Sequence, residues 1–336
     1  MKKIFWLTAI VSVFVVGCQE SNTAKLDDGQ TQSEVTPFDS INALIKQDPN
    51  NPDLYFQRAK MHYEARDLAT SMNDVGRALK LDSGKTDYYL LLADLKLIAK
   101  ESRDSRDALL NAYAINPTDI DVVLRLGELY MIVQDADESF RYLNEALLLD
   151  KFNSTAYRLK GFNYKYLGDT TKAVSSFQTA IEQDPNDYDS YLQLGLLYST
   201  IGHEIAEDYY NNALKVRPQS VEAHYAKGLF YQTIGRSRDA LNTYDDILEI
   251  TGEYFDAWYN KGYVYLVQLQ EYDSAAQQFS KAIQFGPQGY AEAYYNRGLS
   301  YEQMGELKKA EADYREALRI NPQFDLAAQG LGRIVD

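Results

Sequence analysis

The chain has 336 residues, and at roughly 100 to 200 residues per domain this length allows two globular domains or one long repeat array. Apolar residues make up 45% of the chain and charged residues 25%, a composition that argues against wholesale disorder and against a protein with many membrane spans. Acidic residues outnumber basic residues by 49 to 34, for a net charge of -15, so nucleic acids and anionic lipid surfaces are poor partners.

Residues 1–17 are predicted to form a lipoprotein signal peptide. Two lysines follow Met1, and the apolar run Ile4–Val16 is shorter than the roughly 20 residues that cross a bilayer as a helix. The run ends in Val15-Val16-Gly17-Cys18, which resembles the bacterial lipobox, a sequence whose cysteine thiol receives a diacylglycerol. This resemblance implies that Cys18 is lipidated and becomes the mature N-terminus. The alternative is an ordinary secretory leader with a chance cysteine.

Lipidation of Cys18 predicts a protein of the bacterial cell envelope that meets the membrane through its N-terminal lipid only. The residue after the cysteine is Gln19, and a residue other than Asp at this place resembles outer-membrane sorting, although the rule varies among bacteria. We therefore expect the outer membrane rather than the inner one. The rest of residues 18–36 contains few apolar residues and no periodicity, so we expect a disordered tether.

The remainder of the chain repeats with a period of about 34 residues. Small residues recur with gaps of 33 to 36 at one position, namely Ala59, Ala93, Gly127, Gly161, Gly195, Gly228, Gly262 and Gly298. A glycine inside a helix costs roughly 1 kcal/mol relative to alanine, so its recurrence indicates a close approach between helices. The fixed period predicts a solenoid of about eight helix pairs.

The last unit, Tyr294–Tyr301 followed by Gly305, Ala310, Tyr314, Ala317 and Pro322, resembles the tetratricopeptide repeat family. This resemblance implies an all-α fold, a helix-turn-helix solenoid wound as a right-handed superhelix. We expect eight repeats over residues 52–322, an N-terminal capping helix over residues 37–51 and a C-terminal capping helix over residues 323–336.

Large residues recur in the second helix of each predicted pair and are expected to fill the gap between neighbouring hairpins. They are Val75, Leu109, Leu143, Phe177, Tyr210, Tyr244, Phe279 and Tyr314. The sixth repeat has Ile247 where the other repeats have alanine, and Gly252 where most have proline. We therefore expect the sixth repeat to pack somewhat differently.

Catalytic and metal-binding patterns are weak, so we predict that the protein is not an enzyme and uses no metal or cofactor. The single cysteine excludes an intrachain disulfide and a multicysteine zinc site. Gly84-Lys85-Thr86 lacks the glycine that a nucleotide-binding loop needs five residues earlier, where Leu79 stands. Acids recur at one early position of the first helices, namely Asp53, Asp87, Asp121, Asp189, Glu222, Asp256 and Glu292. They complement the helix dipole, or alternatively form a rim that attracts a basic partner.

The first helices are predicted to line a groove through residues spaced i, i+4 and i+7, which share one helical face. Its C-terminal part is aromatic, and its middle is basic and aromatic. The predicted partner-binding residues are Tyr225, Leu229, Tyr259, Tyr263, Leu266, Tyr295, Leu299, Arg158 and Phe162. Tyrosine buries a large area at low entropy cost and keeps a hydroxyl for hydrogen bonding. The alternative is that these residues pack against neighbouring first helices.

These features predict a membrane-anchored tetratricopeptide scaffold or adaptor that binds protein or peptide partners in the envelope. An assembly, secretion or proteolysis complex would fit. The alternative function is a surface lipoprotein that captures glycans or nutrients.

Overall fold

The computed structural model describes residues 36–335, so the predicted signal peptide, Cys18 and nearly all of the tether lie outside the described residues. The chain divides into two units, Met1–Pro49 and Asn50–Asp336. The described part of the first unit holds helix α1 (Pro37–Gln47). The side chain of Thr36 accepts a hydrogen bond from the backbone N–H of Asp39, and the Asp39 carboxylate accepts one from the backbone N–H of Thr36. This reciprocal capping box starts α1 at Pro37.

The second unit consists of eight helical hairpins followed by one more helix, and residues 36–335 contain no strand. The first helices of hairpins 1 to 8 are α2 (Pro52–Glu64), α4 (Thr86–Ile98), α6 (Ile120–Ile132), α8 (Ser154–Tyr166), α10 (Tyr188–Ser199), α12 (Val221–Thr233), α14 (Phe255–Tyr263) continued by the π-helix η1 (Val264–Leu269), and α16 (Ala291–Gln303). The second helices are α3 (Leu68–Leu81), α5 (Ser102–Ile115), α7 (Ala136–Leu149), α9 (Thr170–Gln183), α11 (Ile205–Val216), α13 (Ser237–Ile250), α15 (Tyr272–Phe285) and α17 (Leu307–Ile320), and α18 (Asp325–Val335) follows.

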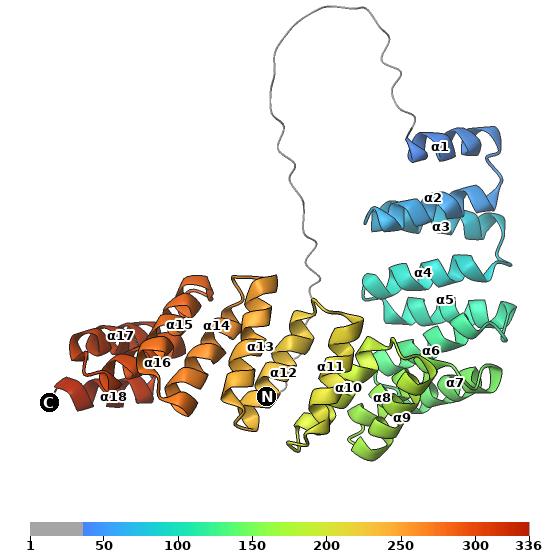
Figure 1. The fold of residues 1–336 in the computed structure, drawn as a ribbon. Coiled ribbons are helices and arrows are strands. Elements are labelled where there is room, and N and C mark those ends of the chain that lie inside the picture. The colour runs from blue at the N-terminus through green and yellow to red at the C-terminus, as the bar shows by residue number, and fades with distance from the viewer. Residues whose placement is uncertain (1–35, 336) are drawn as a thin grey trace, which may run out of the picture. The chain divides into compact units, whose positions relative to one another are not determined.

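Within this unit each helix packs mainly against the helix before it and the helix after it in the chain (Figure 1). The tightest association is between the two helices of one hairpin, and the next is between a second helix and the following first helix. This order is that of a repeat solenoid, in which a unit contacts only its neighbours. The prediction of an all-helical array of about eight helix-turn-helix repeats is confirmed.

Each hairpin turns through one residue with a left-handed backbone. Glycine takes this position in four hairpins, for example Gly168 with φ 79° and Gly235 with φ 77°. Other residues take it in the remaining four, as in Arg66 with φ 62° and Gln270 with φ 56°. Such a residue ends the first helix and allows the chain to reverse into the second.

The recurring first-helix glycines bring the two helices of a hairpin together. A Cβ added at Gly161 would lie 2.6 Å from Phe177 Cε1, and one at Gly228 would lie 2.6 Å from Tyr244 Cε1. The large second-helix residues therefore pack first onto their own hairpin, and not only into the gap between neighbouring hairpins as the sequence suggested. They reach the next hairpin as well, since the rings of Tyr210 and Phe230 lie 6.2 Å apart.

The array changes its packing chemistry after hairpin 3. In hairpins 1 to 3 a buried serine at the start of the second helix donates a hydrogen bond to the carbonyl of the small first-helix residue. These bonds are Ser71 to Ala59 at 2.7 Å, Ser105 to Ala93 at 2.9 Å and Ser139 to Gly127 at 2.6 Å. In hairpins 4 to 8 an alanine replaces the serine and the large residue becomes aromatic. Leu143 in hairpin 3 and the aromatic rings of hairpins 4 to 8 all pack against the first-helix glycine of their own hairpin.

The irregular helix of the array lies in hairpin 7. There α14 gives way to the π-helix η1, and the backbone N–H of Glu271 donates to the carbonyl of Tyr265, six residues earlier. The corresponding bond in hairpin 6 joins Arg236 to Tyr231, five residues earlier. Hairpin 6, which the sequence singled out, has a regular α13, and its Ile247 is fully buried. The π-helix therefore absorbs one extra residue of hairpin 7.

Candidate interaction surface

Seven of the nine predicted binding residues lie on the first helices of hairpins 6 to 8. We call Tyr225, Leu229, Tyr259, Tyr263 and Tyr295 the tyrosine face. Leu229 and Tyr263 occupy equivalent places on α12 and α14, and their exposed fractions are 37% and 38%. The other three side chains are half-buried. The tyrosine face is therefore accessible at Leu229 and Tyr263 and partly covered elsewhere.

Hydrogen bonds between hairpins hold two of the half-buried tyrosines. The side-chain amide of Asn260 donates to the hydroxyl of Tyr225 at 3.1 Å, and that of Asn296 donates to the hydroxyl of Tyr259 at 2.9 Å. Burial raises the pKa of both phenols above the usual value. Both rings therefore help to join successive hairpins, as the packing alternative anticipated.

Tyr295 completes the face at its C-terminal end. Its ring lies 5.8 Å from the ring of Tyr314 and 5.3 Å from that of Phe324, next to α18. Of the two predicted leucines outside the face, Leu299 is half-buried against η1 and α15, and Leu266 on η1 is 6% exposed. Leu266 is too buried to contact a partner, so it is not part of the tyrosine face.

The two predicted residues of hairpin 4 are engaged inside the array. The guanidinium of Arg158 pairs with the buried carboxylate of Asp187 at 3.1 Å. The ring of Phe162 packs edge-on against Phe177 at 5.3 Å. The structure therefore separates Arg158 and Phe162 from the tyrosine face and uses both to join neighbouring helices.

The recurring first-turn acids fall into two groups. Two of them have a cation nearby, because Lys85 pairs with Asp53 at 3.5 Å and Arg125 pairs with Asp121 at 3.1 Å. The other five have no ion pair within residues 36–335. They are Asp87 and Asp189, and the acids of the last three hairpins, Glu222, Asp256 and Glu292.

Asp256 is the most enclosed of these three acids. Burial raises the pKa of its carboxyl above the ordinary value. Burial is also the main reason that the pKa values of Tyr225, Tyr254 and Tyr290 are raised, and the charge of Asp256 raises them further. The ionised carboxylate therefore lies close to three phenols without a compensating positive charge among the described residues.

Two aromatic residues beside the tyrosine face were not predicted from the sequence. Phe255 and Tyr290 lie with their rings 4.9 Å apart, and each also contacts Tyr259, at 5.7 Å and 5.4 Å. They stand at the starts of α14 and α16, outside the i, i+4 and i+7 positions of the predicted groove. The sequence feature that could have identified them is an aromatic residue at the first position of the helix or directly before it.

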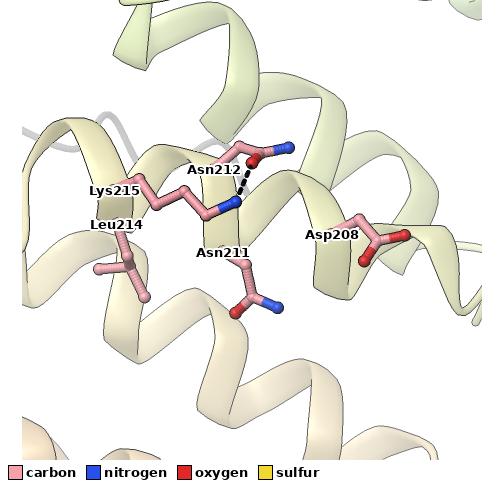
Figure 2. A pocket seen from close by; sticks show the side chains of 5 residues that line it. All are labelled: Asp208, Asn211, Asn212, Leu214 and Lys215. Carbon is pink, nitrogen blue, oxygen red and sulfur yellow. Dashed lines mark hydrogen bonds between the residues drawn. The ribbon is translucent and has the colours of Figure 1, made fainter.

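A hollow of about 690 Å³ follows a single face of α11, outside the tyrosine face. It is lined by Asp208, Asn211, Asn212, Leu214 and Lys215 (Figure 2). The ammonium of Lys215 donates to the side-chain carbonyl of Asn212 at 3.0 Å. This shallow, polar hollow on one helix has neither the apolar lining nor the enclosure of a small-molecule site.

Across residues 36–335, no three His, Cys, Asp or Glu side chains come together as metal ligands would. Every helix in that range is too short or too polar to pass through a bilayer.

Models of the tetratricopeptide repeat match four segments of the chain, residues 154–187, 176–207, 266–305 and 291–324. None of these models describes a catalytic family. The matches fall in hairpins 4 and 5 and in hairpins 7 and 8 with their flanking segments.

Curated proteins with such repeats are similar to parts of this chain. Tetratricopeptide repeat protein 6 of Homo sapiens is 24% identical over 194 residues, which cover 56% of this chain and 37% of that protein. A tetratricopeptide repeat and J domain-containing co-chaperone of Cryptococcus neoformans is 43% identical over 53 residues, 16% of this chain and 10% of that protein. The chain thus spans well under half the length of these relatives.

Among solved structures, the MamA protein is 27% identical and covers 51% of this chain and 92% of its own, with a TM-score of 0.47. The helical hairpins, their common period and the four matched segments agree with one another. The chain therefore contains tetratricopeptide repeats.

Proposed function

We propose that the protein is a lipid-anchored scaffold or adaptor that holds a protein or peptide partner in the bacterial cell envelope, and that it is not an enzyme. Tetratricopeptide repeats generally mediate protein–protein interactions, and this supports the binding role. The proposed anchor rests on the sequence of residues 1–18, the lipobox-like ending at Cys18 above all. Outer-membrane sorting is part of the same proposal, through Gln19.

The observation that carries the binding role is the tyrosine face. Leu229 and Tyr263 are more than a third exposed at equivalent places on neighbouring hairpins, and hydrogen-bonded tyrosines flank them. Aromatic side chains that are already held by hydrogen bonds lose little entropy when a partner binds. Assembly, secretion and proteolysis complexes are all suitable settings for such an adaptor.

No contact among residues 36–335 favours the alternative function, glycan capture. Beyond the predicted leader, the only tryptophan is Trp258, and its indole N–H donates to the backbone carbonyl of Gly252 at 2.9 Å. The chain offers no row of tryptophan rings on which sugars could stack.

Photo-crosslinking tests the position of the binding surface. A photoreactive residue at Tyr263 should crosslink one protein partner when it is activated in intact cells. The control is the same residue at Leu148 on α7, which is 87% exposed but lies outside the tyrosine face. Crosslinks from position 148 and none from position 263 would move the docking surface to hairpin 3.

A further inference from the structure

We propose that the tyrosine face binds a basic segment of its partner, whose lysine or arginine side chains pair with Glu222, Asp256 and Glu292 beside the tyrosine rings. This inference rests on the proposed scaffold function and adds the chemistry of the partner. It is carried by an arrangement that hairpins 6 to 8 share and the other five lack.

In each of these three hairpins an acid precedes a tyrosine of the face by three residues. The pairs are Glu222 with Tyr225, Asp256 with Tyr259, and Glu292 with Tyr295. Contacts between hairpins bring acid and ring together. Burial and then the charge of Asp256 raise the pKa of Tyr225, and burial and the charge of Glu292 are among the causes that raise the pKa of Tyr259. Asp256 and Glu292 therefore each lie close to the tyrosine of the preceding hairpin. The residues at the tyrosine position in hairpins 1 to 5 are Phe56, Leu90, Leu124, Arg158 and Leu192.

Three positive charges of this region are paired with other acids. Lys261 on α14 pairs with Asp245 on α13, and Arg297 on α16 pairs with Asp313 on α17 at 2.8 Å. Arg333 on α18 pairs with Glu302 at 2.8 Å. Asp256 and Glu292 therefore have no ion pair within the described chain, whereas Glu222 lines a hollow together with Arg217. A basic partner would be steered to this acidic surface.

The rings add a second attraction for the same kind of ligand. A lysine or arginine side chain over the face of a tyrosine is stabilised by the ring's quadrupole, and the effect grows when water is excluded. The amides of Asn260 and Asn296 already hold the hydroxyls of Tyr225 and Tyr259, so these rings need little reordering on binding. The exposed side chains of Leu229 and Tyr263 provide apolar contact between the charged positions.

A random peptide library displayed on phage, panned against the full chain in detergent, supplies the probe. Selected sequences should combine Lys or Arg with apolar residues. The tightest one is then synthesised with its basic residues intact and with each replaced by neutral citrulline or acetyl-lysine. The neutral peptide should bind at least about tenfold more weakly, because each lost charge-assisted contact removes a substantial part of the affinity.

Two variants with equal charge change locate the site. Asp256→Asn with Glu292→Gln should weaken the basic peptide by about tenfold or more. Asp87→Asn with Asp189→Asn removes two acids from the same helical position, beside Leu90 and Leu192, and should change the affinity by less than about twofold. Circular dichroism and thermal melting of both variants check that the helices are retained.

Equal losses in the two variants would overturn the proposal, because they would indicate a general attraction to an acidic protein. Selected peptides without basic residues, or equal binding of the neutral peptide, would overturn it too. In these cases, crosslinking from Tyr263 shows whether the proposed scaffold function at this face still holds. If crosslinks persist, only the basic chemistry of the partner is wrong, and if they are absent as well, the scaffold function at this face also fails.

Discussion

At each first-helix glycine the missing side chain sets how closely two helices can approach. The aromatic rings of Phe177 and Tyr244 occupy the space where a Cβ at Gly161 or Gly228 would lie. Such a Cβ can be accommodated only if the ring leaves its rotamer or the helices move apart. Gly76 on α3 differs. Apart from the backbone of its own helix and its two neighbours in the chain, a Cβ added there would have no heavy atom within 4 Å.

Gly228→Ala is therefore expected to lower stability, by about 1 to 3 kcal/mol, because it overpacks the interface with Tyr244. The control Gly76→Ala should be neutral or stabilising by up to about 1 kcal/mol, since alanine favours the helix and meets open space. Urea unfolding followed by circular dichroism measures both. A gain in stability for Gly228→Ala would show that the ring moves aside without strain.

At the scale of an element, the length of the first helix determines whether its glycine faces the large residue of the second helix. Gly228 and Tyr244 of hairpin 6 are 16 residues apart, whereas Gly262 and Phe279 of hairpin 7 are 17 apart. The extra residue of hairpin 7 is absorbed in η1, which keeps Phe279 in contact with Gly262.

Deleting Val267 from η1 should convert the π-helix to a regular α-helix and leave the unfolding midpoint close to that of the parent protein. Val267 is half exposed, so little packing is lost with it. Deleting Thr233 at the end of α12 removes a residue from a regular helix and should lower the midpoint markedly, because Gly228 and Tyr244 then lose their register. Equal effects of the two deletions would mean that η1 does not hold the surplus residue.

The sequence predicted the fold well because its signal is the repetition itself. The small residues from Ala59 to Gly298 occur once per hairpin and meet a large residue of the same hairpin, so spacing alone marks both helices. The gap of 36 between Gly262 and Gly298 showed that residues had been added, but it did not show where. A π-helix and a longer loop before α16 are equally compatible with that number, and the structure contains both.

The candidate surface was predictable in part. Helical phase selected Leu229 and Tyr263, which are exposed, together with Leu266, which η1 turns into the core. The partners of Tyr225 and Tyr259 are Asn260 and Asn296, each in the following hairpin. Contacts between hairpins depend on how successive units stack, and helical phase within one unit does not contain that information.

For the whole molecule, the proposed lipid on Cys18 decides where the scaffold works. Cys18→Ser removes the thiol that would carry the diacylglycerol, so the variant should leave the detergent-extracted membrane fraction. Each buried methylene of an acyl chain contributes about 0.8 kcal/mol, so the difference in partitioning should be large. Cell fractionation followed by immunoblotting measures it, with Ser21→Ala as a neighbouring control. Unchanged processing and membrane retention of Cys18→Ser would contradict the lipobox interpretation.

The packing of each hairpin mainly on its chain neighbours determines how the array responds to mechanical tension. If the second unit is pulled from its two ends, the load passes through every hairpin in series, and no distant contact shares it. Hairpins should then open one after another, starting with the weakest. Each opened unit of 34 residues would lengthen the chain by on the order of 100 Å at full extension. The array would in that way act as an extensible spring, with a force trace made of similar, evenly spaced steps.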